Sequence, residues 1–146
     1  MIRIVKTRKV KTPARGNPQD AGLDFFVPED FPNTLLEPGQ SVNIPSGIKV
    51  EITPNSAGIF LNKSGIAKKG LIIGAQVIDC GYTGEVHLNL HNVGLESHKI
   101  EPGMKVAQML ILPVALNNPV EMSEKYEINT YESERGEGAF GSTGTK

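Results

Sequence analysis

The chain has 146 residues, which fits one domain of ordinary size and leaves no room for a second. Its 15 Lys and Arg residues nearly balance 16 Asp and Glu residues, and a net charge of −1 predicts no stable nucleic-acid binding. Gly (16) and Pro (10) are so frequent that a helical bundle is excluded.

The single cysteine provides no disulfide framework, and no apolar run is long enough for a signal peptide or a membrane span. We therefore expect a cytoplasmic protein with no membrane partner, while a nuclear or viral origin stays open.

The N-terminal segment is basic. Every charged side chain before Asp20 is a Lys or an Arg. Two interpretations are open, because such side chains either contact phosphate groups or protect an edge strand from pairing with another chain. The basic residues are Arg3, Lys6, Arg8, Lys9, Lys11 and Arg15.

Strand-like patterns dominate the middle of the chain. Apolar and polar residues alternate over 48–52 and over 86–91, which predicts two half-buried strands. Residues 71–73 and 109–112 are short apolar runs, typical of strands covered on both faces. Helices should be short, and residues 64–68 could begin one, so the pattern predicts an all-β sandwich or small barrel.

Two Glu-Pro-Gly sequences, at 37–39 and 101–103, favour type II turns because Pro suits the second turn position and Gly the third. We expect them to make hairpin-like reversals between strands.

Apolar content falls after about residue 117, and the last twelve residues, 135–146, hold four glycines. This segment should be flexible by itself. Its Arg135, Phe140, Ser142 and Thr143 could cover a ligand that has an anionic end and a planar ring. A frayed terminus is the alternative.

Two segments carry candidate chemistry. Lys63, Ser64 and Gly65 combine a cation, a hydroxyl and an accessible amide, as a phosphate cradle requires. Asp79 follows an apolar run and could orient and deprotonate a water, while Tyr82 could pack on a sugar or base. The alternative is a hairpin in which Asp79 and the following glycine serve only the turn.

The sequence gives little support for a zinc site or for a cysteine nucleophile. His87 and His91 share a strand face but lie four residues apart, or roughly 13 Å, so one zinc ion cannot bridge them. Cys80 has no nearby His to activate it as a nucleophile.

Together, five segments of the chain, in order, resemble the motifs of the trimeric dUTP nucleotidohydrolase (dUTPase) family. The chain departs from the family where Lys63 and Lys105 replace the usual Arg, where Gln76 replaces a frequent Gly, and where Ala139 replaces a second Gly. Lys keeps the charge but loses the bidentate fork of Arg. The five segments are Ala21-Gly22-Leu23-Asp24, residues 63–67, residues 77–85, residues 102–108 and residues 135–144.

The resemblance implies an all-β, dUTPase-like jelly roll (β-clip) over residues 1–134 and a mobile arm over 135–146 that closes over an active site. It implies a dUTP diphosphatase that hydrolyses dUTP to dUMP and pyrophosphate with Mg²⁺, supplying dUMP for thymidylate synthesis and keeping uracil out of DNA. It also implies a homotrimer whose active sites are shared between subunits.

By the same resemblance, Asp79 activates the water and Asp24 reaches Mg²⁺ through waters, the metal being held chiefly by the substrate phosphates. Tyr82 packs on the deoxyribose, and a β-hairpin containing residues 77–82 recognises uracil through its main chain. The implied substrate-binding residues are Lys63, Ser64, Gly65, Gln76, Val77, Ile78, Tyr82, His87, Gln108, Arg135, Phe140, Gly141 and Ser142.

Two alternatives remain. A dCTP deaminase, or a bifunctional deaminase-dUTPase, has the same fold and also uses a phosphate cradle. The second alternative is a noncatalytic regulatory module that has the dUTPase-like fold but does not hydrolyse a nucleotide.

Overall fold

The computed structural model describes residues 2–117, which form eleven β-strands and one short helix. The predicted arm and its boundary at residue 134 lie outside the described residues and stay predictions. The elements are β1 (Arg3–Lys6), β2 (Leu23–Phe26), β3 (Thr34–Leu36), β4 (Ser41–Pro45), β5 (Ile48–Glu51), β6 (Ser56–Leu61), α1 (Ser64–Ala67), β7 (Leu71–Gly74), β8 (Val77–Asp79), β9 (His87–Asn92), β10 (His98–Ile100) and β11 (Lys105–Pro113).

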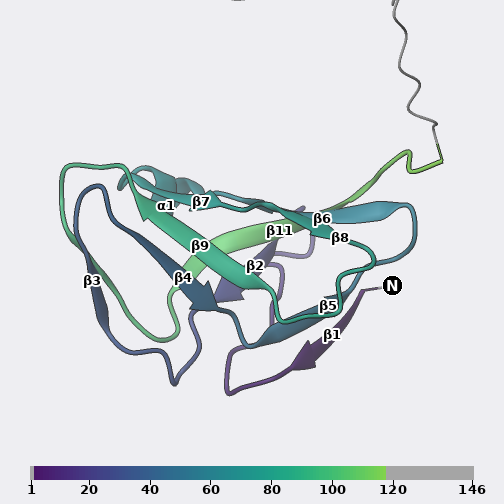
Figure 1. The fold of residues 1–146 in the computed structure, drawn as a ribbon, viewed down its shortest axis with the longest axis horizontal. Coiled ribbons are helices and arrows are strands. Elements are labelled where there is room, and N and C mark those ends of the chain that lie inside the picture. Colours follow the sequence, from purple (N-terminus) through teal and green to yellow (C-terminus); the bar gives the residue numbers. More distant parts are fainter. Residues whose placement is uncertain (1, 118–146) are drawn as a thin grey trace, which may run out of the picture. The chain divides into compact units, whose positions relative to one another are not determined.

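The strands form four antiparallel sheets (Figure 1). The largest has the order β2-β11-β6-β8, and a three-stranded sheet has the order β4-β9-β7. Two further pairs, β1-β5 and β10-β3, complete the fold. Most neighbours in a sheet are distant in sequence, so long-range contacts hold this fold together.

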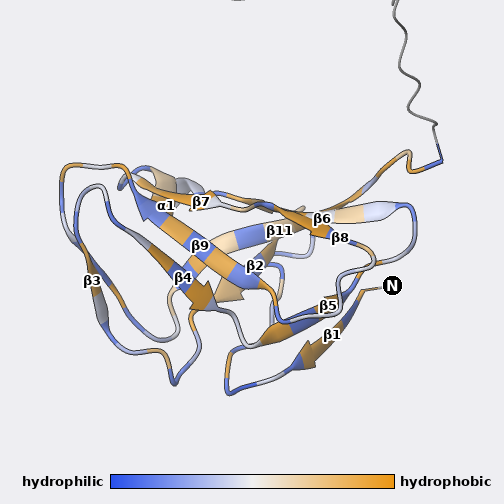
Figure 2. Ribbon diagram, in the orientation of Figure 1, coloured by the Kyte–Doolittle hydropathy of each residue, from blue (hydrophilic) through white to orange (hydrophobic). Residues whose placement is uncertain are grey.

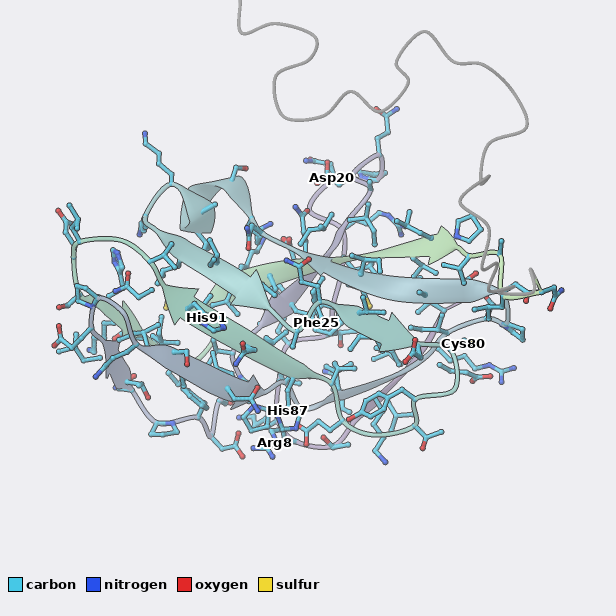
Figure 3. The ribbon with its side chains drawn as sticks, turned by 45° about the horizontal axis from the view of Figure 1, so that its top comes forward. Arg8, Asp20, Phe25, Cys80, His87 and His91 are labelled. Atoms are coloured by element: carbon cyan, nitrogen blue, oxygen red, sulfur yellow. The ribbon has the colours of Figure 1, made fainter. Side chains whose placement is uncertain are left out.

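The core consists mainly of aliphatic side chains, as expected for a chain without Trp. Strand β9 shows the principle, because buried Leu88 and Leu90 alternate with more exposed polar residues. Figure 2 shows the resulting apolar and polar bands along β9. Phe25 and Phe60 join neighbouring parts of the large sheet through an edge-to-face contact at 4.9 Å, and Figure 3 shows Phe25 within the fold.

The two alternating segments are confirmed as strands β5 and β9, with their apolar side chains buried. The short helix is also confirmed, as α1. The prediction that 109–112 is covered on both faces is wrong at its end, because Met109 is buried whereas Leu112 is exposed. Leu112 pairs with Ala57 near the start of β6 and is 43% exposed within the described residues.

Both Glu-Pro-Gly sequences form the expected turns. Gly39 and Gly103 have φ angles of +80° and +81°, which glycine adopts without strain. The expectation of hairpins is wrong, since β3 and β4 lie in different sheets, as do β10 and β11. A type II turn reverses the chain locally, but the partner of each strand is chosen by long-range packing.

The basic N-terminal segment contains an edge strand, because β1 pairs with β5 in a two-stranded sheet. Arg3 of β1 lies 3.3 Å from Glu51 across this pair. The edge-strand interpretation is therefore confirmed for residues 3–6. No helix within residues 2–117 is both long and apolar enough to cross a membrane.

Candidate active site

A buried carboxylate organises the first group of predicted site residues. Asp24 lies in β2, and its side chain is only 7% exposed. Its Oδ1 accepts a hydrogen bond from Lys63 Nζ, and its Oδ2 lies 2.8 Å from Lys105 Nζ. Lys63 immediately precedes α1, and Lys105 begins β11, so three separate segments meet at this carboxylate.

The two lysines keep Asp24 ionised. Burial by itself raises the pKa of Asp24, but hydrogen bonds and charge attraction from Lys105 and Lys63 outweigh it and lower the pKa below its ordinary value. Two ammonium groups around one carboxylate leave a net positive charge of one at this point. The cluster therefore offers a local attraction for a polyanion that the net charge of the whole chain does not reveal.

Gln108 lies beside Asp24, because these two residues are register partners of β11 and β2. Its Nε2 donates to the main-chain oxygen of Asn62 at 2.9 Å, which ties β11 to the segment before α1. Gly22 leaves space for this side chain, since a Cβ there would lie 2.4 Å from Gln108 Oε1. Packing against Gln108 therefore explains why a glycine stands at residue 22, in the first of the five family segments.

The start of α1 presents the predicted phosphate cradle. Ser64 and Gly65 are exposed, and a Cβ on Gly65 would meet nothing within 4 Å, so a ligand can approach this backbone closely. The side chain of Asn62 supports the segment from behind, because its Oδ1 accepts the Ile73 N–H at 2.7 Å. The structure thus brings Lys63, Ser64 and Gly65 together with Gln108.

The second group of predicted residues lines one cavity of about 260 Å³. Asp79 stands at the end of β8, and Tyr82 and His87 come from the loop that follows and from the start of β9. Asn43 Nδ2 of β4 lies 2.9 Å from His87 Nδ1, within hydrogen-bond distance, which ties the His87 ring to the neighbouring strand. The cavity is lined by Ala75, Val77, Ile78, Asp79, Tyr82, Val86 and His87.

The prediction that residues 77–82 belong to a β-hairpin is wrong. Strand β8 pairs with β6, whereas β9 pairs with β4 and β7, so the loop between β8 and β9 crosses from one sheet to another. As the last strand of its sheet, β8 has one edge that pairs with no other strand in the described residues. The main-chain groups of that edge are available to a ligand.

Tyr82 is held by its own loop. Its hydroxyl donates to the Glu85 main-chain oxygen at 2.8 Å, and its amide donates to the Asp79 oxygen at 3.0 Å. Gly84 leaves room for the Tyr82 side chain, because a Cβ at residue 84 would lie 2.4 Å from the Tyr82 hydroxyl oxygen. Tyr82 remains 45% exposed and lines the cavity, so a ligand there can contact it.

Within one chain the two groups lie at opposite ends of β6. Gln108 pairs with Leu61 at the last residue of β6, and Asp79 pairs with Ala57 near its first. Four residues of extended strand separate these points by roughly 13 Å. One chain alone therefore does not place Asp79 beside the cradle.

Lys105 and Asn62 belong to the site but were not among the predicted binding residues. Lys105 was noted only as a departure from the family. The contacts of both residues depend on which strands meet in the fold, so no local pattern reveals them. The side chain of Gln76, by contrast, points to the Ile73 oxygen at 3.0 Å and does not line the cavity. Arg135, Phe140, Gly141 and Ser142 lie outside the described residues.

Comparison with known proteins identifies relatives over most of the chain. The family model for dUTPase matches residues 8–144. The deoxyuridine 5'-triphosphate nucleotidohydrolase of Clostridium kluyveri is 40% identical over 129 residues, covering 86% of this chain and 85% of the relative. The Pol polyprotein of equine infectious anemia virus is 37% identical over 126 residues, or 86% of this chain, and the chain spans only 10% of that polyprotein.

Solved structures of dUTPases also resemble this chain. A Staphylococcus bacteriophage 80alpha dUTPase mutant with dUpNHpp has a TM-score of 0.84 at 28% identity, covering 99% of this chain and 98% of that one. The native EIAV dUTPase has a TM-score of 0.71 at 32% identity, covering 85% of this chain and 98% of that one. The predicted all-β jelly roll is confirmed, and the chain belongs to the dUTPase family.

Proposed function

We propose that this chain is a dUTP diphosphatase, which hydrolyses dUTP to dUMP and pyrophosphate. The observation that carries the proposal is the cavity in which Asp79 and Tyr82 stand together beside an unpaired strand edge, in a chain that matches the dUTPase family over residues 8–144. Such a reaction would supply dUMP for thymidylate synthesis and keep uracil out of DNA.

Asp79 acts as the general base. Its carboxylate orients a water molecule and accepts its proton as the water oxygen bonds to the α-phosphorus. The bond from the α-phosphorus to the oxygen that bridges to the β-phosphate breaks, and pyrophosphate leaves with the electron pair. Asp79 is exposed at the end of a strand, so the proton can pass on to solvent.

The triphosphate binds at the cradle. Lys63, Ser64 and the Gly65 amide contact phosphate oxygens, helped by Gln108, and Lys105 adds positive charge beside them. Lys63 has three N–H donors, so it can bind a phosphate oxygen without leaving Asp24. Positioning and charge neutralisation are the main requirements of phosphoryl transfer.

Uracil binds against the free edge of β8. The main chain of residues 76–78 can match the donors and acceptors of the base, and main-chain groups left unpaired beneath a bound base would disfavour bases with another pattern. Tyr82 packs on the deoxyribose and leaves no space for a 2′-hydroxyl. His87 lines the same cavity, where the side chain of Asn43 holds its ring.

Mg²⁺ fits this arrangement when the substrate phosphates supply most of its ligands. No group of three or more His, Cys, Asp or Glu side chains in the described part of the chain could hold a metal, whereas Asp24 is an ionised carboxylate beside the cradle. Its oxygens retain lone pairs beyond those used by the two lysines, so they can accept hydrogen bonds from metal-bound waters. When bound, Mg²⁺ would neutralise charge on the phosphate oxygens.

The protein works as a homotrimer with active sites shared between subunits. The separation of Asp79 from the cradle along β6 supports this, because the α-phosphorus must meet both the activated water and the cradle. A cradle from one subunit facing the cavity of another brings the two groups together. The arm, with Arg135 on the terminal phosphate and Phe140 over uracil, flanked by Gly141 and Ser142, then closes over the substrate.

The decisive experiment measures pyrophosphate release from dUTP, UTP, dCTP and dTTP, with and without Mg²⁺. We expect release from dUTP alone, with strong dependence on Mg²⁺. Ammonia release from dCTP would instead identify a deaminase, and no turnover of any nucleotide would identify a noncatalytic module. A cytoplasmic location stays a prediction that rests on the cysteine count.

A further inference from the structure

Arg8, in the basic N-terminal segment, reaches the loop that carries Tyr82. Its Nε lies 3.2 Å from Glu85 Oε1, and its Nη1 lies 3.3 Å from Asp30 Oδ2. Figure 3 shows Arg8 at the same edge of the fold as His87, two residues after Glu85. The buried Arg8 Nε makes no aligned hydrogen bond within the described residues, so charge attraction is the main component of its contact with Glu85.

The Glu85 carboxylate has a second partner. The same Oε1 accepts the Gly47 N–H at 2.6 Å, in the turn between β4 and β5. Val86, the next residue, forms two main-chain hydrogen bonds with the flanks of that turn, to Ser46 at 3.1 Å and to Ile48 at 2.9 Å. The end of the loop is therefore fastened to this turn by one side-chain and two main-chain hydrogen bonds.

Gly47 is required for this arrangement. Its φ of +73° favours glycine, and a Cβ there would lie 2.4 Å from Arg8 Cγ. The absence of a side chain lets the stem of Arg8 lie across the turn, where its guanidinium meets both Glu85 and Asp30. The Glu85 side chain is 19% exposed and that of Arg8 is 32% exposed, so water screens this pair less than a surface pair.

Glu85 connects this fastening to the cavity. Its main-chain oxygen accepts the Tyr82 hydroxyl at 2.8 Å, and the next two residues, Val86 and His87, line the cavity. A shift of the Glu85 backbone would therefore move the Tyr82 ring and one cavity wall together. The Glu85 side chain itself is not among the groups that line the cavity.

We propose that Arg8 and Glu85 form an ionic clamp that fixes the loop of residues 80–86 against the β4-β5 turn and so positions Tyr82 against the sugar of the substrate. Both are positioning residues. The clamp gives the N-terminal segment a role in substrate selection, and it rests on the proposed function only through the identity of the sugar.

The test compares Arg8→Gln and Glu85→Gln with wild type and with the control variant Arg3→Gln. The control removes an ion pair of the same type from the same segment, but one whose side chains are 71% and 64% exposed and do not line the cavity. The readout is the ratio of kcat/KM for dUTP to kcat/KM for UTP. A variant that merely lowers the folded fraction scales both values equally and leaves the ratio unchanged.

We expect each clamp variant to lower this ratio about tenfold, a difference of about 1.4 kcal/mol, chiefly through a gain with UTP and a higher KM for dUTP. The double variant should resemble the single ones, because removing either partner breaks the same pair. Arg8→Lys, which retains the charge, should recover part of the ratio. Unchanged ratios in both clamp variants would overturn the proposal.

Amide hydrogen exchange provides a readout that needs no substrate. The Tyr82 amide, bonded to Asp79, and the Val86 amide, bonded to Ile48, should exchange about tenfold faster in Arg8→Gln but not in Arg3→Gln. Equal protection in all variants would overturn the clamp even if dUTP is not the substrate. Absence of dUTP turnover in wild type, with faster exchange in the clamp variants, would overturn only the proposed function.

Discussion

Replacing Asp24 with Asn tests the electrostatic centre of the proposed site. The substitution keeps the shape of the side chain but removes its charge, so Lys63 and Lys105 would face an amide and each other. Removing one partner of a fully buried ion pair costs about 3–5 kcal/mol, whereas an exposed pair contributes at most about 1 kcal/mol. Asp24 is buried, but the lysine side chains are 26% and 46% exposed and can turn toward water.

We therefore expect a loss of about 2 kcal/mol in the free energy of unfolding, between those limits. For a chain of 146 residues this corresponds to a decrease in Tm of roughly 6 °C. Urea denaturation at neutral pH measures the loss, with wild type and variant at equal protein concentration because assembly contributes to stability. Glu51→Gln, which breaks the exposed pair with Arg3, is the control and should change stability by less than about 0.5 kcal/mol.

The pH dependence gives the sharper test. The pKa of Asp24 is lower in the folded chain than in the unfolded chain, so the folded state favours the carboxylate. Its contribution to stability is fully present above the unfolded pKa and is lost as the pH falls through the folded pKa. The difference between wild type and Asp24→Asn should be constant near neutral pH and should shrink below about pH 4. Equal stabilities at neutral pH, or a difference that persists in acid, would refute the assignment of the lysine pairs.

Three further predictions concern catalysis. Asp79→Asn should retain dUTP binding but lower kcat by roughly 10²–10⁴, measured by pyrophosphate release and by calorimetric titration with a nonhydrolysable analogue; wild-type turnover would remove Asp79 from the role of base. Deleting residues 135–146 should leave a folded oligomer with little activity, and unchanged kcat/KM in the truncated chain would contradict the closing arm. Gly22→Ala should displace Gln108, because the new Cβ would lie 2.4 Å from its Oε1, and should raise KM about tenfold. An unchanged KM for dUTP would show that Gln108 does not contact the phosphates.

Local features of the fold were predictable from the sequence. The alternation over 86–91 identified β9 because side chains of a strand point to opposite faces, whatever the strand pairs with. The Pro-Gly pairs identified two turns because Gly tolerates a positive φ. The same turns were wrongly expected to make hairpins, since their geometry carries no information on which sheet the following strand joins.

The candidate site also has features that the sequence predicted and features that only the fold shows. The motifs identified Asp24, Lys63 and Asp79 as bearers of chemistry, since a carboxylate or an ammonium group has that potential wherever it lies. They did not show that Asp24 is held between two lysines, because Lys63 is 39 residues away in sequence and reaches it only when β2, β11 and the start of α1 meet. The contact of Arg8 with Glu85 was invisible for the same reason.

Residue chemistry, strand periodicity and turn preference are properties of short segments, so the sequence by itself determined the family, the all-β class and most of the side chains expected to act. Pairing between sheets, burial of a charge and the pKa of a carboxylate depend on segments far apart in the chain. Only the tertiary structure decided that the loop after β8 crosses between sheets, that the cradle and Asp79 lie at opposite ends of β6, and that the basic N-terminal segment reaches the loop bearing Tyr82.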